Sequence, residues 1–164
     1  FEKLLPEGRS CRILNPQDWA PVCSILHEQH PKSVGVFQRN RKKSRRFQME
    51  LVKNLADYGN NPLLLTMDSI DSGTTDVQSE ALPPESQNPA NEIEQRTRNS
   101  HNSPVVFDPG NSPSSRAYSA LLACDIILYV AQKDMTTLEQ IRSDMNYFSG
   151  VGSEKKIFGI YYAL

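Results

Sequence analysis

This sequence lacks any apolar run close to the ~20 residues that a membrane-spanning helix needs, and its start does not resemble a signal peptide. Its three cysteines, Cys11, Cys23 and Cys124, form no CxxC pair, and their odd number argues against a disulfide framework. The formal net charge is only −1, so nothing attracts the whole chain to nucleic acid or anionic lipid. These absences predict a cytoplasmic protein with reduced cysteines in its core.

The composition is that of one ordinary globular domain. With 164 residues, 38% of them hydrophobic, the chain is long enough to bury a core, and we expect a single domain over 1–164. It starts at Phe1 without a methionine, which suggests an excised fragment. Short apolar runs alternate with helical patterns, which is typical of βαβ units. The fold class predicted is α/β, a three-layer, doubly wound, mainly parallel sheet with helices on both faces.

Local signals place the individual elements. A helix is expected over 44–58, with Phe47, Leu51, Leu55 and Tyr58 as its apolar stripe. Three further helices are expected to start at Asn15-Pro16, at Ser112-Pro113 and at a capping box of Thr136 and Glu139. The predicted strands cover 11–14, 33–37, 62–67, 105–107, 125–131 and 156–162.

Residues 69–103 differ in composition from the rest. Serine, proline, asparagine, glutamine and acidic residues dominate there, and aromatic residues are absent. Such a segment has little apolar surface to offset the entropy of ordering, so we expect a mobile insertion, with a weak helix at 91–98. A functional lid is the alternative.

Acidic residues stand at the predicted carboxyl ends of strands: Asp68, the nearby Asp71, and Asp108. Ligands of open parallel sheets bind at that edge, and carboxylates there can hold Mg²⁺ directly or through water. Strand-end aspartates also serve as turn residues and helix caps, and both readings stay open.

A dense basic segment, QRNRKKSRR at 38–46, lies between a predicted strand and a predicted helix, and six of its nine residues are cationic. Backbone N–H groups at a helix start favour an anion, to which these side chains add charge. The alternatives are a solvated surface loop and a binding patch for nucleic acid or an anionic membrane surface. The candidate anion-binding residues are Arg39, Arg41, Lys42, Arg45 and Arg46.

The order of several segments along the chain is informative. Lys43-Ser44 stands before a predicted helix, the predicted strand PLLLTMD follows, and VVFDPGNSPSSRAYSALLACDIILYV and KIFGIYYAL come after it. In this order the chain resembles the MinD/ParA-type P-loop ATPases, including the cytoplasmic domains of bacterial polysaccharide-export tyrosine kinases. The resemblance implies a P-loop NTPase-like fold and ATP with Mg²⁺ as ligands. It maps nucleotide binding to Lys43, Ser44, Asp68 and Asp108, with Ser44 and the two aspartates at the metal. It also implies a protein partner, such as a membrane-bound export component, or a homo-oligomer, and a place in the cytoplasm or peripherally at the inner membrane.

The phosphate loop departs from the family pattern KGGxGK[ST]. The early lysine is Gln38, and the three glycines are Arg39, Asn40 and Lys42. Those glycines permit backbone torsions and a close approach that side chains obstruct. We therefore expect a degenerate relative, a regulatory or scaffold protein in exopolysaccharide biosynthesis or export or in cellular positioning, with weak or absent ATP hydrolysis. An active ATPase or tyrosine-kinase-like enzyme is the alternative.

Two further pairs have plain structural interpretations. His27 and His30, three residues apart beside Pro31, are expected to cap a helix end rather than to hold zinc. Tyr161 and Tyr162 fall in the predicted last strand and are expected in the core rather than in a tyrosine tail.

Overall fold

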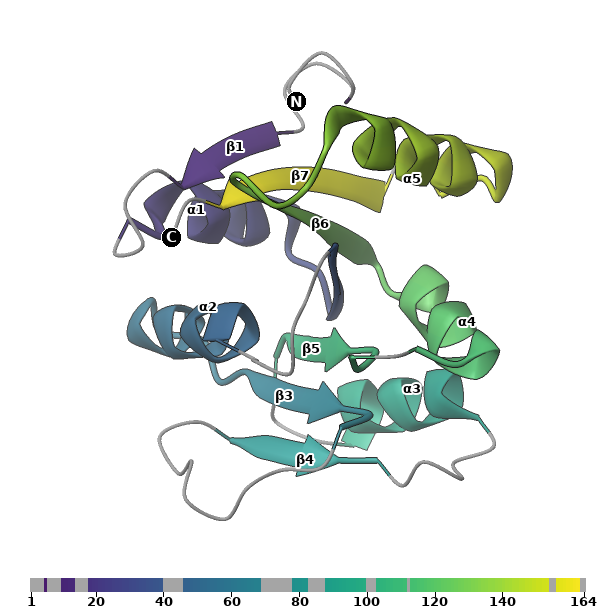
Figure 1. Ribbon diagram of the computed structural model, residues 1–164. Helices are drawn as coiled ribbons and strands as arrows, with labels where there is room; N and C mark the ends of the chain where they lie inside the picture. The colour runs from purple at the N-terminus through teal and green to yellow at the C-terminus, as the bar shows by residue number, and fades with distance from the viewer. Residues whose placement is uncertain are drawn as a thin grey trace.

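In the computed structural model, the described residues form one sheet of seven strands in the order β1-β7-β6-β2-β5-β3-β4 (Figure 1). Every pair of neighbouring strands is parallel. The structure describes residues 5, 10–13, 18–39, 46–68, 78–82, 88–99, 103–111, 113–153 and 156–162. The strands are β1 (Ser10–Ile13), β2 (Ser33–Gln38), β3 (Leu63–Thr66), β4 (Ser79–Ala81), β5 (Val105–Asp108), β6 (Ile126–Gln132) and β7 (Ile157–Tyr162). The helices are α1 (Ala20–Gln29), α2 (Arg46–Asp57), α3 (Pro89–Asn99), α4 (Ser115–Ala123) and α5 (Leu138–Gly150).

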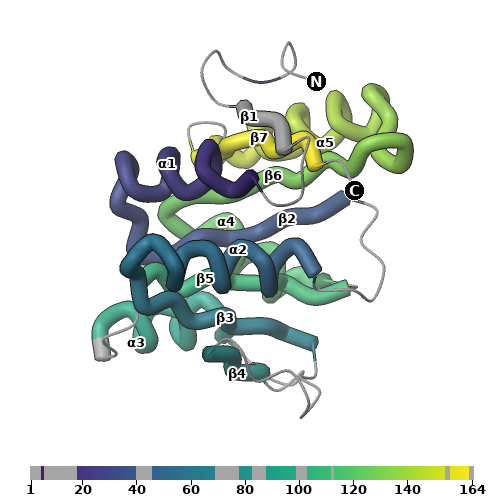
Figure 2. Tube along the Cα trace, turned by 90° about the vertical axis from the view of Figure 1, so that its left-hand side faces the viewer, coloured from purple at the N-terminus to yellow at the C-terminus, as the bar shows by residue number. Residues whose placement is uncertain are grey.

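Helices cover both faces of the sheet. Figure 2 shows α1 and α2 in front of one face, where they bury Trp19, Leu26 and Leu51 against strand residues such as Val34 and Val36. The opposite face of the sheet carries α3, α4 and α5, and its core includes Leu121, Phe148 and Phe107. Successive side chains of a strand point to opposite faces, so one apolar run serves both cores. The three-layer, doubly wound α/β architecture is confirmed.

Central strand β2 allows α4 to approach closely because its third residue is glycine. A Cβ atom built on Gly35 would lie 2.5 Å from Leu121 Cδ1 and 3.3 Å from Cys124 Sγ. Both of those side chains are fully buried. Real Cβ atoms do not come this close to a neighbour, so the glycine sets the distance between β2 and α4.

Several helix starts differ from the sequence-based predictions. Trp19, rather than Asn15, is the N-cap of α1, and the proline near the start of that helix is Pro21. Ser114 caps α4 through the N–H of Ala117, two residues later than predicted. The capping box of α5 joins Thr137 and Gln140 rather than Thr136 and Glu139. Near each of the last two starts a second hydroxyl-bearing residue stands within two positions of the actual N-cap, so the sequence offers more than one cap.

Parts of the segment 69–103, for which the sequence predicted a mobile insertion with a weak helix, form regular secondary structure. Residues 79–81 form β4, which pairs with β3, and α3 is longer than the weak helix expected. Leu82 and Ile93 are buried against the sheet, and Arg96 forms ion pairs with Glu80 and Glu92. The two apolar side chains and the Arg96–Glu80 ion pair hold the described parts of this segment against the sheet. Residues 69–77, 83–87 and 100–102 lie outside the described residues.

The remaining structural predictions concern core and capping residues. Cys23 and Cys124 are buried thiols, and burial raises their pKa to about 11 and about 12. His30 is the left-handed C-cap of α1, as its position suggested. Tyr162 is buried and Tyr161 packs against the core from a half-buried position. Tyr58, by contrast, is 59% exposed just after α2.

Within the described residues, no helix is long and apolar enough to cross a membrane.

Candidate functional site

The carboxyl ends of β2 and β5 are the point where the sheet changes winding direction. The two strands are neighbours in the sheet, but the helix after β2 packs on one face and the helix after β5 on the other. At such a switch point the two chains diverge and leave a crevice, which is the usual ligand site of open α/β sheets. A cavity of about 170 Å³ lies there, between Gln38 and Arg39 on one side and Asp108, Asn111 and Tyr118 on the other.

Asp68 and Asp108 come together at this edge, as the sequence predicted. The strand register sets Thr66 of β3 beside Asp108 of β5. The Thr66 hydroxyl donates to Asp108 Oδ2 at 2.9 Å, and the same hydroxyl oxygen accepts the Asp68 N–H at 3.1 Å. Asp108 and Thr66 are fully buried, and Asp68 is partly exposed. A single threonine links the two acidic residues, and no sequence motif singled it out.

The turn after β5 folds back over both carboxylates. The Gly110 N–H donates to Asp108 Oδ1 at 3.1 Å, and the Asn111 N–H lies 3.2 Å from each oxygen of Asp68. Gly110 has φ +97°, and a Cβ atom there would lie 2.9 Å from Asp68 Oδ1. Only glycine suits both the left-handed torsion and the contact. The PGN sequence after Asp108 therefore holds two backbone N–H groups against the acidic residues.

Arg39 forms the opposite wall of the crevice. Its Nε is a buried atom that lies 3.5 Å from Asp144 Oδ2 on α5, and it has no hydrogen-bond acceptor among the described residues. The same carboxylate oxygen accepts the Tyr129 hydroxyl at 2.5 Å. Burial raises the pKa of Asp144, although the Tyr129 hydrogen bond and the Arg39 charge act in the opposite direction. Sequence reasoning missed Asp144 and Tyr129, because they are distant along the chain and belong to no motif.

A pair of amides joins the end of β2 to the start of α2 across the predicted phosphate loop. Gln48, only 1% exposed, donates from Nε2 to Gln38 Oε1 at 3.3 Å. Its own Oε1 is buried, and no described residue donates a hydrogen bond to it. Gln38 stands where the P-loop pattern has its early lysine, so an uncharged pair occupies a position that the pattern gives to a cation.

The central residues of the basic loop, Arg41, Lys42, Lys43, Ser44 and Arg45, lie outside the described residues, as does Asp71. The two described cations of that loop both have carboxylate partners. Arg39 pairs with Asp144, and Arg46 donates to Glu50 at 3.2 Å on the exposed side of α2.

The oxygen atoms that the structure brings together here are suitable ligands for a hard cation. Asp68, Asp108 and Thr66 offer only oxygen atoms, the ligands that Mg²⁺ prefers. Both carboxylates already accept hydrogen bonds from the protein, which favours contact with the ion through its water shell. No cluster of three or more Asp, Glu, His or Cys residues able to hold a metal occurs among the described residues.

Comparison with known proteins identifies the fold. No protein-family model and no curated protein sequence matches the chain. Among solved structures, the BceF tyrosine kinase domain is similar, with a TM-score of 0.61 and 15% identity over 95% of this chain and 84% of that one. The chimerical protein CapA2B2 is also similar, with a TM-score of 0.61 and 13% identity over 97% of this chain and 94% of that one. At such identities the likeness establishes a P-loop NTPase-like fold, and a tyrosine kinase domain is one protein that shares it.

Proposed function

We propose that this chain is a degenerate P-loop ATPase-like protein with a regulatory or scaffold role, which binds nucleotide weakly and hydrolyses it slowly or not at all. The carrying observation is the crevice at the carboxyl ends of β2 and β5, where Thr66 and the turn at Gly110 hold Asp108 and Asp68. In this proposal Lys43 contacts phosphate, and Ser44, Asp68 and Asp108 hold Mg²⁺, which neutralises phosphate charge when bound.

The wall of the crevice supports weak rather than efficient activity. Arg39 takes the place of the first glycine of the phosphate loop, and its side chain is drawn to Asp144. His30 and Asp134 are the non-glycine residues with positive φ in the described part of the chain, so Arg39 does not adopt the left-handed torsion that glycine permits. A side chain therefore lines the crevice at a position where the family pattern offers bare backbone for a close approach to phosphate.

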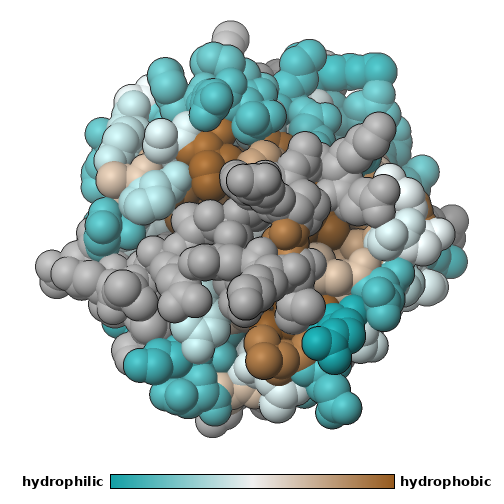
Figure 3. All heavy atoms as spheres, turned by 90° about the horizontal axis from the view of Figure 1, so that it is seen from above, coloured by the Kyte–Doolittle hydropathy of each residue, from teal (hydrophilic) through white to brown (hydrophobic). Residues whose placement is uncertain are grey.

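The proposed setting is exopolysaccharide biosynthesis or export, at or near the inner membrane, with a membrane-bound export component or a second copy as partner. The similar fold of a tyrosine kinase domain supports this setting over cellular positioning. Figure 3 views the molecule from above and shows a few hydrophobic patches within a mainly hydrophilic described surface. The exposed side chains of α5 include Leu138 and Tyr147, with Val151 just after the helix. Apolar and aromatic side chains of this kind are common at protein interfaces.

The test is a calorimetric titration with Mg²⁺-ATP, run beside a measurement of phosphate release. We expect weak binding that Lys43→Ala abolishes and phosphate release no faster than the buffer blank. Lys53→Ala is the matched control, because Lys53 is an exposed lysine on α2, outside the phosphate loop. It removes the same charge and should leave the binding unchanged.

Two results would contradict the proposal. Phosphate release at about 1 s⁻¹ or faster, within the ordinary range of enzymes, would establish the active enzyme instead. Binding that Lys43→Ala and Lys53→Ala weaken equally would show that the loop lysine holds no phosphate.

A further inference from the structure

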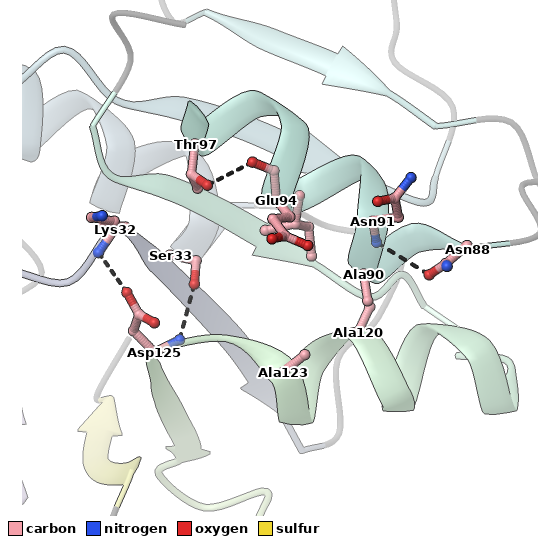
Figure 4. Close-up of a pocket in the computed structure, with 11 residues that line it drawn as sticks. Lys32, Ser33, Asn88, Ala90, Asn91, Glu94, Thr97, Ala120, Ala123 and Asp125 are labelled. Atoms are coloured by element: carbon pink, nitrogen blue, oxygen red, sulfur yellow. Dashed lines mark hydrogen bonds between the residues drawn. The ribbon is translucent and has the colours of Figure 1, made fainter. Parts of the chain in front are cut away.

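A second cavity lies at the opposite edge of the sheet, where β2 and β6 begin. Its volume is about 340 Å³, within the roughly 300–1,000 Å³ typical of small-molecule sites. Figure 4 shows it between α3 and α4, with the turns before the two strands closing one end. No residue of this cavity lines the crevice that holds Asp108.

Small apolar side chains keep this space open. Ala90 and Ile93 of α3 lie across from Ala120 and Ala123 of α4. Three of the four are alanine, so the two helices approach each other without filling the gap between them. The result is a narrow apolar floor on which a short hydrocarbon chain can lie.

Two carboxylates face this floor from different elements. Glu94 projects from α3 toward the gap, and Asp125 stands in the turn before β6 (Figure 4). Asp125 Oδ2 accepts the Lys32 N–H at 2.8 Å, and its backbone N–H donates to Ser33 Oγ at 2.9 Å. These two bonds fix the position of Asp125, and its second oxygen makes no hydrogen bond with the described residues. Glu94 forms an ion pair with Arg98, one turn along the exposed side of α3.

The chemistry of the walls selects the ligand class. The residues that line the cavity include two carboxylates and one ammonium group, that of Lys32, so the lining itself is negative, although Arg98, outside the lining, offsets part of the Glu94 charge. Its carboxylate oxygens are acceptors that call for N–H donors, and its floor is apolar. We propose that this cavity binds a small aliphatic amine, with its ammonium groups at Asp125 and Glu94 and its methylene groups on the alanines.

The amine site is independent of the proposed nucleotide crevice. It uses α3, which lies inside the segment 69–103 and which the P-loop resemblance gave no role. Loss of amine binding would leave the nucleotide proposal untouched, and loss of nucleotide binding would leave the amine site untouched.

The test is an NMR titration of the whole chain with putrescine, followed through backbone amide resonances, with sodium acetate as the anionic comparison. We expect putrescine to shift the amides of Ser33, Ala120 and Asp125, and acetate to leave them in place. Glu94→Gln and Asp125→Asn should each weaken the apparent affinity about threefold to fivefold, the range of a partly exposed ion pair. The matched control is Glu139→Gln on α5, an exposed residue outside the cavity, which should have no effect.

A second variant tests whether the ligand occupies the cavity, rather than whether it pairs with the carboxylates. Ala123→Leu replaces a methyl group by an isobutyl group at an exposed position of α4 that lines the cavity, and it should weaken putrescine binding more than tenfold while the melting temperature is kept. The proposal is overturned if putrescine shifts no amide, or if Glu139→Gln weakens binding as much as Glu94→Gln. It is also overturned if a folded Ala123→Leu chain still binds putrescine with the original affinity.

Discussion

Strand β2 has a cavity near each of its ends, and the two cavities differ in how far their charged groups are already bonded to the protein. At its carboxyl end the charged groups are already engaged with the protein: Asp108 with Thr66 and Gly110, Asp68 with Asn111, and Arg39 with Asp144. At its amino end, Asp125 uses one carboxylate oxygen to accept the Lys32 N–H, and Glu94 faces the gap between two helices. A ligand of the first site must displace or share existing bonds, whereas at the second site one carboxylate oxygen of Asp125 makes no hydrogen bond with the described residues, although Glu94 is paired with Arg98. The charged groups of the first cavity are therefore held more firmly by the protein, and the Asp125 carboxylate of the second cavity is more accessible to a ligand.

Gly35 offers the strongest way to disturb both ends at once, because it lies between them on β2 and faces α4. We expect Gly35→Ala to lower the free energy of unfolding by about 1–3 kcal/mol, the usual cost of overpacking a core, since Leu121 is fully buried and has no open space to move into. Urea denaturation with an unchanged m-value measures this loss.

The matched control for that variant is Gly150→Ala, at the end of α5. A Cβ atom on Gly150 meets nothing within 4 Å, so the change should be neutral or stabilising by up to about 1 kcal/mol. Equal effects of the two variants would refute the close packing of β2 on α4.

Gly110 separates the two ends, since it belongs to the carboxyl-end site alone. Gly110→Ala should cost about 1–2 kcal/mol through its left-handed torsion, and more through the contact of the new methyl group with Asp68 Oδ1. Gly152→Ala has the same sign of φ, +73°, but open space around it, so it reports the torsion alone. The difference between their unfolding free energies measures the contact. If the two variants have equal unfolding free energies, the turn at Gly110 does not press on Asp68. If Gly110→Ala also weakens putrescine binding, the cavities at the two ends of β2 are coupled.

The smallest expected effect is a pH dependence at Asp144. Burial, its largest influence, raises the pKa of this carboxyl above the ordinary value of 3.8, so the folded chain binds the proton more readily than the unfolded chain. Its contribution to stability is therefore largest below 3.8 and is lost as the pH rises through the folded pKa. The unfolding free energy of the wild type minus that of Asp144→Asn should rise as the pH is lowered through this range.

Tyr129→Phe sharpens the same measurement. The Tyr129 hydrogen bond lowers the pKa of Asp144, so its removal should move the pH-dependent step to higher pH. Tyr58→Phe, at an exposed tyrosine, should leave the step in place. A wild-type difference that stays flat with pH would mean that Asp144 is not desolvated.

Sequence periodicity predicted the fold better than it predicted element boundaries. The runs at 125–131 and 62–67 indicate buried strands because they are short, continuous and apolar, and β6 and β3 confirm them. The N-caps of α1, α4 and α5 lie one to four residues later than predicted. Serine and threonine residues near the starts of α4 and α5 offer alternative caps, and Trp19 begins α1 without a side-chain cap bond, so no local signal marks it. The segment 69–103 gave too weak an apolar signal to predict β4, whose pairing with β3 is a contact with another part of the chain.

The site was predictable where it follows from strand ends. Asp68 and Asp108 could be placed at one edge because the carboxyl ends of parallel strands meet there. Thr66, Asp144 and Tyr129 could not be selected, since each acquires its role from a neighbour on a different element. The cavity between α3 and α4 likewise could not be predicted from the sequence, because its existence depends on which faces of the two helices meet.

The sequence by itself determined the α/β architecture and the acidic carboxyl edge of the sheet, since both depend on local periodicity and on the direction of parallel strands. Only the tertiary structure decided that Arg39 is drawn to Asp144, that Gly110 closes on Asp68, and that alanines on two helices leave a second, acidic cavity. The physical reason is that these features are distances between groups far apart in the chain, and such distances are fixed by packing rather than by any local preference.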